Sequence, residues 1–266
     1  MSSWPTTRAR LVRADNPSPM TLEGTNTWVL VEPGQTAAIV VDPGPNDPQH
    51  LHAILDAVHS AGAAEVALIV LTHGHPDHAE SAATFAASTG SVVRAAATDL
   101  CVGAEKLTDG ESIEVAGLRL GVVATPGHTA DSVCLVVTGD RALLTGDTIL
   151  GRGSTVVAHP DGKLADYLQT LEKLGLLVEE RGLFVVLPGH GPVRDDPAAV
   201  IAEYRVHRAQ RLDQVRAAIA AGATTVDAVL ASVYGDVSAS LQHAARWSLL
   251  AQLDYLRESG EPAPTA

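Results

Sequence analysis

Short apolar runs alternate with turn residues along the first two thirds of the chain, whereas the last third carries apolar residues at helical spacing. Residues 66–71 form a continuous apolar run of the length typical of a buried β-strand. Residues 49–61 place apolar side chains at positions i, i+3, i+4 and i+7, which predicts an amphipathic helix. Residues 1–20 contain three prolines and predict an irregular lead-in. The pattern therefore predicts an α+β fold followed by a helical part.

The pattern of apolar and turn residues also predicts the order of the strands and helices. Strands are predicted over residues 28–31, 37–42, 66–71, 91–96, 113–115, 119–124, 132–137, 142–145 and 183–187. Helices are predicted over residues 49–61, 79–89, 164–178, 197–221, 224–234 and 238–259. Because no strand is predicted after residue 187, we expect one domain of strands and helices over residues 1–197 and a small helical domain over residues 198–266.

The composition supports a folded protein with a large core. Hydrophobic residues make up 46% of the 266 residues and charged residues 18%, which excludes a disordered chain. The net charge is −13 and aromatic residues make up 3%. A protein that wraps a duplex presents a basic face, and one that stacks many bases needs aromatic side chains. We therefore expect no duplex DNA partner, whereas a small or locally bound anionic or acyl substrate is compatible with this composition.

No segment predicts a membrane span or a secretory signal. The longest apolar runs are far shorter than the roughly 20 residues that cross a bilayer, and residues 1–20 lack the apolar core of a signal peptide. We therefore expect a cytoplasmic protein with no membrane partner. Cys101 and Cys134 are too few for a disulfide framework or a cysteine-based zinc site. The alternatives are a single bridge and two small core residues, and we favour the second.

The most informative segment reads Thr-His-Gly-His-Pro-Asp-His over residues 72–78 and directly follows the predicted strand 66–71. Functional loops are held rigidly at the ends of strands. His73 and His75, two residues apart, can point the same way and bind one metal, while Asp77 and His78 can address a second ion close by. Imidazole and carboxylate suit zinc, and also iron or manganese.

Three further segments repeat one arrangement, in which a ligand-type side chain stands beside a glycine after an apolar strand. These side chains are His128, Asp147 and His190. Each glycine allows the backbone to turn sharply next to the polar group. Any one of them alone is more often an ordinary turn residue, but the repetition favours a shared metal centre.

The order H-x-H-x-D-H, then His, Asp and His, resembles the metallo-β-lactamase superfamily over residues 16–190. The resemblance implies a four-layer αβ/βα sandwich with a dinuclear metal centre at one edge of the sheets. Position by position, it implies a first metal bound by His73, His75 and His128, and a second bound by Asp77, His78 and His190. It further implies that Asp147 bridges the two metals and that Asp42 supports the metal loop without binding metal itself.

A closer resemblance is visible outside the ligands. Residues 16–27 and 146–155 resemble the β-lactamase-like protein 2 group, which includes single-strand-specific endoribonucleases and to which fungal thioesterases are similar. The group carries a small winged-helix-like domain at its C-terminus, although little sequence follows residue 259 here to form a wing. The C-terminal helices are expected to act as a lid, as a homodimer surface, or as both.

The resemblance implies hydrolysis by a hydroxide that bridges two divalent metals, with zinc expected first and iron or manganese as alternatives. Asp77 is the expected catalytic residue, since its carboxylate can orient the nucleophile and move a proton. The leading prediction is phosphodiester cleavage of single-stranded RNA, with hydrolysis of a thioester or another acyl ester as the alternative. A β-lactamase and a non-catalytic metal-binding module rank lower, because Asp147 replaces the usual cysteine and all seven ligand positions are filled. Candidate anion anchors are Arg152, Arg205 and Arg208.

Overall fold

A computed structural model describes residues 5–265, which divide into two units. The first unit holds the described residues up to Ala124 together with Asp131–Gly153 and Arg181–Pro197. The second holds Thr125–Ala130, Ser154–Glu180 and the residues from Ala198 onward. One border between the units lies at Pro197, the residue at which the sequence predicted a domain boundary, while the two predicted domains themselves stay a prediction. The other borders were not predicted, because two internal segments leave the first unit and join the second.

The first sheet belongs to the first unit and has the strand order β1-β2-β3-β4-β5. Its strands are β1 (Ala9–Arg13), β2 (Asn26–Val31), β3 (Ala37–Val41), β4 (Glu65–Val70) and β5 (Val92–Arg94). The first three strands pair antiparallel, whereas β3, β4 and β5 pair parallel. Parallel pairing brings the carboxyl ends of β3 and β4 to the same edge, where Asp42 and the histidine-rich segment follow.

The second sheet also belongs to the first unit and has the order β11-β10-β9-β8-β7-β6. Its strands are β6 (Ser112–Val115), β7 (Leu118–Ala124), β8 (Val133–Val137), β9 (Ala142–Gly146), β10 (Val185–Pro188) and β11 (Arg194–Asp195). Strands β9 and β10 pair parallel and the remaining neighbours antiparallel. Asp147 and His190 therefore follow two strands that end at one edge.

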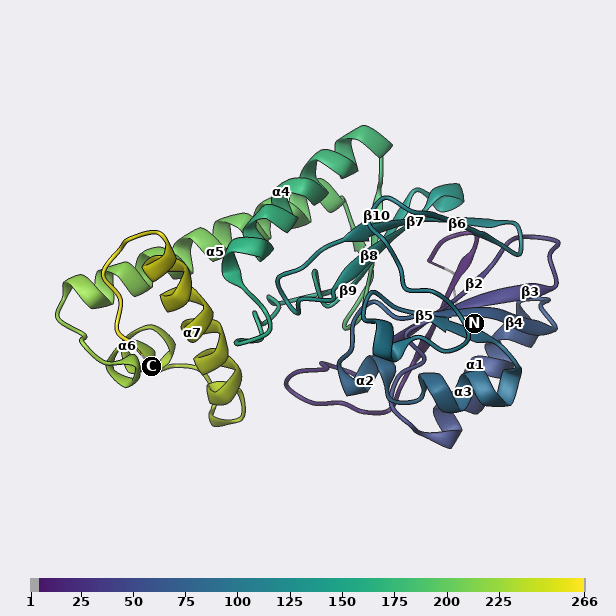
Figure 1. The fold of residues 1–266 in the computed structure, drawn as a ribbon, viewed down its shortest axis with the longest axis horizontal. Coiled ribbons are helices and arrows are strands. Elements are labelled where there is room, and N and C mark those ends of the chain that lie inside the picture. The colour runs from purple at the N-terminus through teal and green to yellow at the C-terminus, as the bar shows by residue number, and fades with distance from the viewer. Residues whose placement is uncertain (1–4, 266) are drawn as a thin grey trace. The chain divides into compact units, whose positions relative to one another are not determined.

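Alternation along the strands builds two separate cores. Trp28 and Leu30 of β2 point into a core shared with the second sheet, where Leu120 and Leu135 are buried. The intervening Val29 points into another core, closed by the helices α1 (Pro48–Ser60) and α3 (Ala82–Thr89). Figure 1 shows both helices against one face of the first sheet. The predicted α+β sandwich of two facing sheets is confirmed.

Helices dominate the second unit. They are α4 (Leu164–Arg181), α5 (Pro197–Ala220), α6 (Val226–Tyr234), a short 3₁₀ turn and α7 (Gln242–Glu258). Thr225 caps α6, since its hydroxyl accepts a hydrogen bond from the amide of Ala228. Residues 198–265 contain no strand, so this stretch holds the predicted helices without the wing of a winged helix. Among the described residues, no helix has the length and hydropathy needed to cross a membrane.

The structure corrects two of the predicted elements. Residues 1–20 were expected to be irregular, but Ala9–Arg13 form β1, which pairs with β2 at the edge of the sheet. An edge strand buries less of its surface than a central strand and so tolerates charged residues. The arginines of β1 therefore interrupt the apolar run that would predict a strand. The helix predicted over residues 79–89 begins later, as α3, and a short helix that was not predicted, α2 (Pro76–Ala79), precedes it. Cys101 and Cys134 are free thiols, as favoured.

Candidate metal centre

The histidine-rich segment begins where β4 ends and runs directly into α2. The backbone of His75 is extended and precedes Pro76 in the first turn of α2, a position where the missing amide of proline costs nothing. His78 lies on α2 and is fully buried, and His73 is buried in the turn before it. One strand end and one short helix thus place three imidazoles and the Asp77 carboxylate side by side.

Two groups of potential ligands result. In each group, one nitrogen or oxygen atom from every residue lies within 4.8 Å of the others. The first group consists of His73, His75, His128 and Asp147, and the second of Asp77, His78 and His190. These are the seven predicted ligand positions, divided as the resemblance implied, with Asp147 in the first group. Their roles as metal ligands stay a prediction.

Nitrogen atoms face each other within both groups. His78 Nε2 lies 3.2 Å from His190 Nε2, and His73 Nε2 lies 3.1 Å from His75 Nδ1. Asp147 reaches the second group as well, with Oδ1 3.4 Å from His78 Nε2 and Oδ2 3.2 Å from His190 Nε2. Imidazole nitrogens and carboxylate oxygens that converge in this way form a donor set that suits zinc, iron or manganese.

Hydrogen bonds outside the two groups indicate which ring nitrogen His128 and His78 present. His128 Nδ1 lies 2.6 Å from the carbonyl oxygen of Val156, and His78 Nδ1 lies 2.9 Å from Oδ2 of Asp42. A carbonyl oxygen or an ionised carboxylate only accepts, so each Nδ1 must donate its proton. When Nε2 carries no proton, its lone pair is therefore available to a metal, which is the usual arrangement around zinc-binding histidines.

Asp42 connects the ends of two neighbouring strands. Its side chain accepts hydrogen bonds from the amide and the hydroxyl of Thr72, each at 2.7 Å, in addition to the bond from His78. Its backbone has a φ of 52°, which few residues other than glycine adopt, and the side chain is buried. Such a conformation persists where surrounding contacts impose it. Asp42 therefore links Thr72 to His78, and its role in supporting a metal loop stays a prediction.

Opposite charges shift the titration of the second group. Burial alone raises the pKa of Asp77, but the hydrogen bond from His190 and the charge of His78 outweigh it and lower this pKa to about 2. Burial lowers the pKa of His190, but Asp147 and Asp77 outweigh it and raise this pKa to about 9. The pKa of His78 is likewise raised and that of Asp147 lowered, in both cases against the effect of burial. Without metal, the group is a set of imidazolium–carboxylate pairs.

One glycine beside the centre has no room for a side chain. A Cβ atom on Gly189 would lie 2.7 Å from Asp147 Oδ1 and 2.7 Å from His78 Cε1. Because glycine has no Cβ atom, the backbone at residue 189 can approach these two side chains closely. This explains why a glycine precedes His190 in the repeated sequence pattern.

The three candidate anion anchors have other partners. Arg152 and Glu23 form an exposed ion pair, and Arg205 Nη2 lies 3.9 Å from Glu172 Oε1 in another exposed pair. Arg208 is buried, donates a hydrogen bond to the carbonyl oxygen of Thr155 and stacks over another side chain, with Cζ 4.9 Å from the ring centre of Tyr167. A role for these arginines in binding substrate stays a prediction.

Residues 25 and 26 support the centre and were quoted in the sequence only as part of a resemblance. Asn26 Nδ2 donates to the carbonyl oxygens of Pro188 and Gly191, at 3.0 and 2.9 Å, and so holds both sides of the turn that carries His190. Thr25 donates to Asp77. In the sequence, residues 25 and 26 stand out only as polar residues near turn residues. Their pattern does not reveal a contact such as that of Asn26 with Pro188, which lies 162 positions away.

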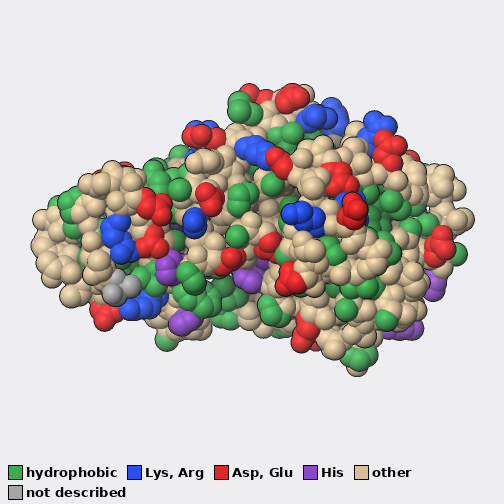
Figure 2. Space-filling model, viewed as in Figure 1, with side chains coloured by type: hydrophobic (Ala, Val, Ile, Leu, Met, Phe, Trp, Pro, Cys, Tyr) green, Lys and Arg blue, Asp and Glu red, His purple; other side chains and the backbone are tan. Residues whose placement is uncertain are grey.

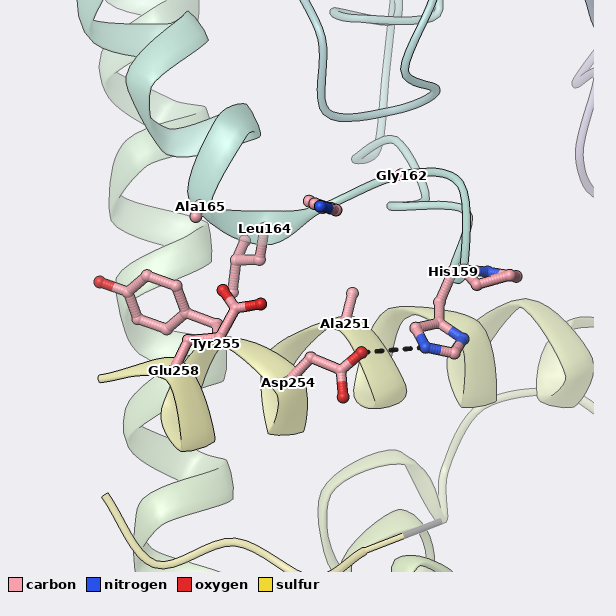
Figure 3. Close-up of a pocket in the computed structure, with 10 residues that line it drawn as sticks. His159, Gly162, Leu164, Ala165, Ala251, Asp254, Tyr255 and Glu258 are labelled. Carbon is pink, nitrogen blue, oxygen red and sulfur yellow. Dashed lines mark ion pairs between the residues drawn. The ribbon is translucent and has the colours of Figure 1, made fainter. Parts of the chain in front are cut away.

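A small pocket lies within the second unit. It is lined by the segment before α4 and by α7, and the ion pair between His159 and Asp254, 3.0 Å long, crosses it (Figure 3). Lys163 and Glu258 also line this pocket. None of its lining residues belongs to either group of potential ligands.

Comparisons with known proteins show what the chain is similar to. The sequence model of the metallo-beta-lactamase superfamily matches residues 20–190. A beta-lactamase-like protein 2 homolog of Caenorhabditis elegans is 35% identical over 207 residues, which are 74% of this chain but only 65% of that protein. An atrochrysone carboxyl ACP thioesterase of Aspergillus chevalieri is 32% identical over 256 residues, 87% of this chain and 75% of that protein. A beta-lactamase domain protein of Burkholderia ambifaria shares the fold with a TM-score of 0.80 at 24% identity, over 97% of this chain and 88% of that one.

Proposed function

The chain belongs to the metallo-β-lactamase superfamily, whose members are metal-dependent hydrolases, and on that premise we propose that it hydrolyses acyl thioesters at a centre of two divalent cations. The proposal rests on the two groups of potential ligands. In each group the potential ligand atoms lie within 4.8 Å of one another. Zinc is the proposed metal, with iron or manganese as alternatives, because imidazole and carboxylate ligands suit all three.

The proposal assigns a role to each residue of the two groups. His73, His75 and His128 would hold the first cation and Asp77, His78 and His190 the second, with Asp147 between them. Bound divalent cations lower the pKa of water towards neutrality and stabilise negative charge that develops on a substrate. The Asp77 side chain is partly accessible to solvent, with 28% of its surface exposed. Its carboxylate would therefore be able to orient an attacking water molecule by accepting a hydrogen bond from it.

The charges of the molecule favour a thioester over RNA. Each arginine proposed to anchor a polyanion already has a partner, and the net charge is −13. On the face that Figure 2 shows, Lys and Arg side chains lie scattered among Asp and Glu side chains. A thioester carbonyl needs no extended cationic surface, and the similar Aspergillus protein is named a thioesterase.

Cleavage of single-stranded RNA is the second candidate. It is supported by the resemblance of residues 16–27 to a group that includes endoribonucleases, and by the similarity to the nematode protein named after that group. An RNA substrate would have to reach the cations through few phosphate contacts, since counterion release by many basic residues is not available to an acidic protein.

One preparation tests both candidates. The metal-free protein is loaded with zinc, and hydrolysis of acyl thioesters and cleavage of single-stranded RNA are measured side by side. We expect thioester turnover that is lost in His78→Ala and in Asp147→Ala and retained in His52→Ala, a matched control on the exposed face of α1. RNA cleavage without thioester turnover would reverse the order of the candidates. Turnover that survives His78→Ala would overturn the two-metal proposal.

A further inference from the structure

We propose that Thr25, oriented by Asn16, is a positioning residue that assigns different tasks to the two carboxylate oxygens of Asp77. This inference rests on the proposed function, because it takes Asp77 to serve the second cation. Thr25 Oγ1 lies 3.0 Å from Asp77 Oδ2, and Thr25 is fully buried. The two residues are 52 positions apart in the sequence, so the contact is made by the fold alone.

The direction of the hydrogen bond from Thr25 to Asp77 follows from the bonds around it. The backbone amide of Thr25 donates to Asn16 Oδ1 at 2.8 Å, which identifies that atom as the amide oxygen of Asn16. The other amide atom, Asn16 Nδ2, therefore carries the hydrogens and donates to Thr25 Oγ1 at 3.0 Å. Since one side of the Thr25 hydroxyl already accepts this bond, its own hydrogen is directed to Asp77 Oδ2.

The contacts of Asp77 are one-sided. Oδ2 accepts the bond from Thr25 and also lies 3.2 Å from His190 Nε2 and 3.4 Å from His78 Nε2. Within the described residues 5–265, no polar contact of this carboxylate uses Oδ1. The arrangement therefore turns Oδ2 towards the two histidines of the second group and leaves Oδ1 for a water molecule.

The backbone around Thr25 is held on both sides. Its carbonyl oxygen accepts from the amide of Ala14 at 2.8 Å, and residue 25 forms a β-bridge with His190, which belongs to the second group. Gly24 has a φ of 129°, and a Cβ atom there would lie 2.0 Å from the carbonyl oxygen of Ala14. The glycine thus permits a close approach that brings Asn16 and the hydroxyl of Thr25 to Asp77 with little freedom to move.

The consequence is chemical as well as structural. A carboxylate that rotates freely can present either oxygen to a cation and can bind through both at once. A donor fixed on Oδ2 disfavours that rotation and reserves Oδ1 for a water molecule. Hydrogen bonds of this kind, from residues that do not themselves bind the metal, typically change metal affinity by about 10-fold to 100-fold when removed.

The experiment compares two substitutions at one position. Thr25→Val keeps the shape of the side chain and removes the hydroxyl, whereas Thr25→Ser keeps the hydroxyl and removes a methyl group. Metal-free proteins are titrated with zinc, and the cobalt-loaded proteins are compared by their visible spectra. We expect Thr25→Val to bind the second equivalent of zinc about 10-fold more weakly and to change the cobalt spectrum. Thr25→Ser should stay within about 2-fold of the parent.

Asn16→Asp provides an independent variant. Its carboxylate still accepts from the amide of Thr25, but it replaces a donor by an acceptor and so draws the Thr25 hydroxyl away from Asp77. We expect the same weakening as in Thr25→Val. Thr89→Val is the control, because it removes a hydroxyl that bonds only within and just beyond α3.

The outcomes separate the two proposals. If Thr25→Val binds both zinc equivalents as the parent does, or if Thr25→Ser weakens binding equally, the positioning role is overturned. Unfolding of each metal-free variant shows whether a loss of affinity is accompanied by general destabilisation. Zinc titration needs no substrate, so a parent protein that binds two zinc ions and hydrolyses neither substrate class contradicts the proposed function and leaves this inference standing.

Discussion

His78 Nδ1 lies 2.9 Å from Asp42 Oδ2, and both side chains are buried. Because Asp42 can only accept, the bond keeps a proton on Nδ1 and leaves Nε2 to face Asp77, His190 and Asp147. The relationship joins the end of β3 to the helix α2 and determines the tautomer of a proposed ligand. It also identifies a substitution that changes chemistry with little change of shape.

Asp42→Asn is predicted to weaken metal binding while the fold is retained. An NH₂ group in place of Oδ2 would donate to His78 Nδ1 and so move the ring proton to Nε2, where it competes with a cation. We expect zinc affinity to fall by about 10-fold to 100-fold, measured by competition with a chromogenic chelator. Asp56→Asn, on the exposed face of α1, is the matched control. Unchanged affinity in Asp42→Asn would show that the tautomer of His78 is set by another contact.

Zinc binding is predicted to release protons at neutral pH. The raised pKa values of His78 and His190 mean that both rings are protonated in the metal-free protein at pH 7, whereas the lowered pKa values of Asp77 and Asp147 keep both carboxylates ionised. Binding therefore displaces protons, which calorimetry in buffers of different ionisation enthalpy measures. At a pH above about 9, where His190 is already neutral, the release should decrease. A binding enthalpy that is the same in every buffer contradicts this prediction.

Arg208 and Arg205 are predicted to differ sharply in their effect on stability, although the sequence placed them together. Arg208→Ala removes a buried hydrogen bond to Thr155 and the contact with Tyr167, and should cost about 2–4 kcal/mol of unfolding free energy. Arg205→Ala removes an exposed ion pair with Glu172 and should cost less than about 1 kcal/mol. Urea unfolding of the two variants decides the matter, and equal losses would contradict the assignment.

His207 is predicted to make the protein less stable in acid. Burial, together with the charges of Arg208 and Arg211, lowers the pKa of His207 to about 4. Since the unfolded chain binds this proton near pH 6.5, the unfolded state holds more protons between pH 6.5 and about 4. This contribution is complete above pH 6.5 and is lost as the pH falls towards 4. His207→Gln should therefore lose less stability than the parent between pH 7 and pH 5 in urea unfolding, whereas His52→Gln should behave like the parent.

Much of the fold could be predicted because it depends on local patterns. The strand predicted over residues 66–71 and the helix predicted over residues 49–61 are found as Glu65–Val70 and Pro48–Ser60. Apolar runs and helical periodicity reflect burial, which each segment shows in its own sequence. The strand Ala9–Arg13 was missed because its stability comes from pairing with β2 at the sheet edge rather than from its own pattern.

Local patterns did not predict the different environments of Arg205 and Arg208. Arg205 and Arg208 were both predicted from the sequence as candidate anion anchors. In the structure, Arg208 is buried against Thr155 and Tyr167, while Arg205 remains exposed beside Glu172. Spacing determines which residues share a helix face, but what packs on that face depends on other segments.

The sequence by itself determined the kind of centre, because histidine and aspartate beside glycine at strand ends can be read residue by residue. Only the tertiary structure decided how those side chains are held. The donor on Asp77 comes from Thr25, 52 positions away, and the acceptor for His78 comes from Asp42, 36 positions away. Hydrogen-bond direction depends on which groups meet in space. The tautomers and carboxylate orientations that would govern the chemistry are therefore properties of the folded chain.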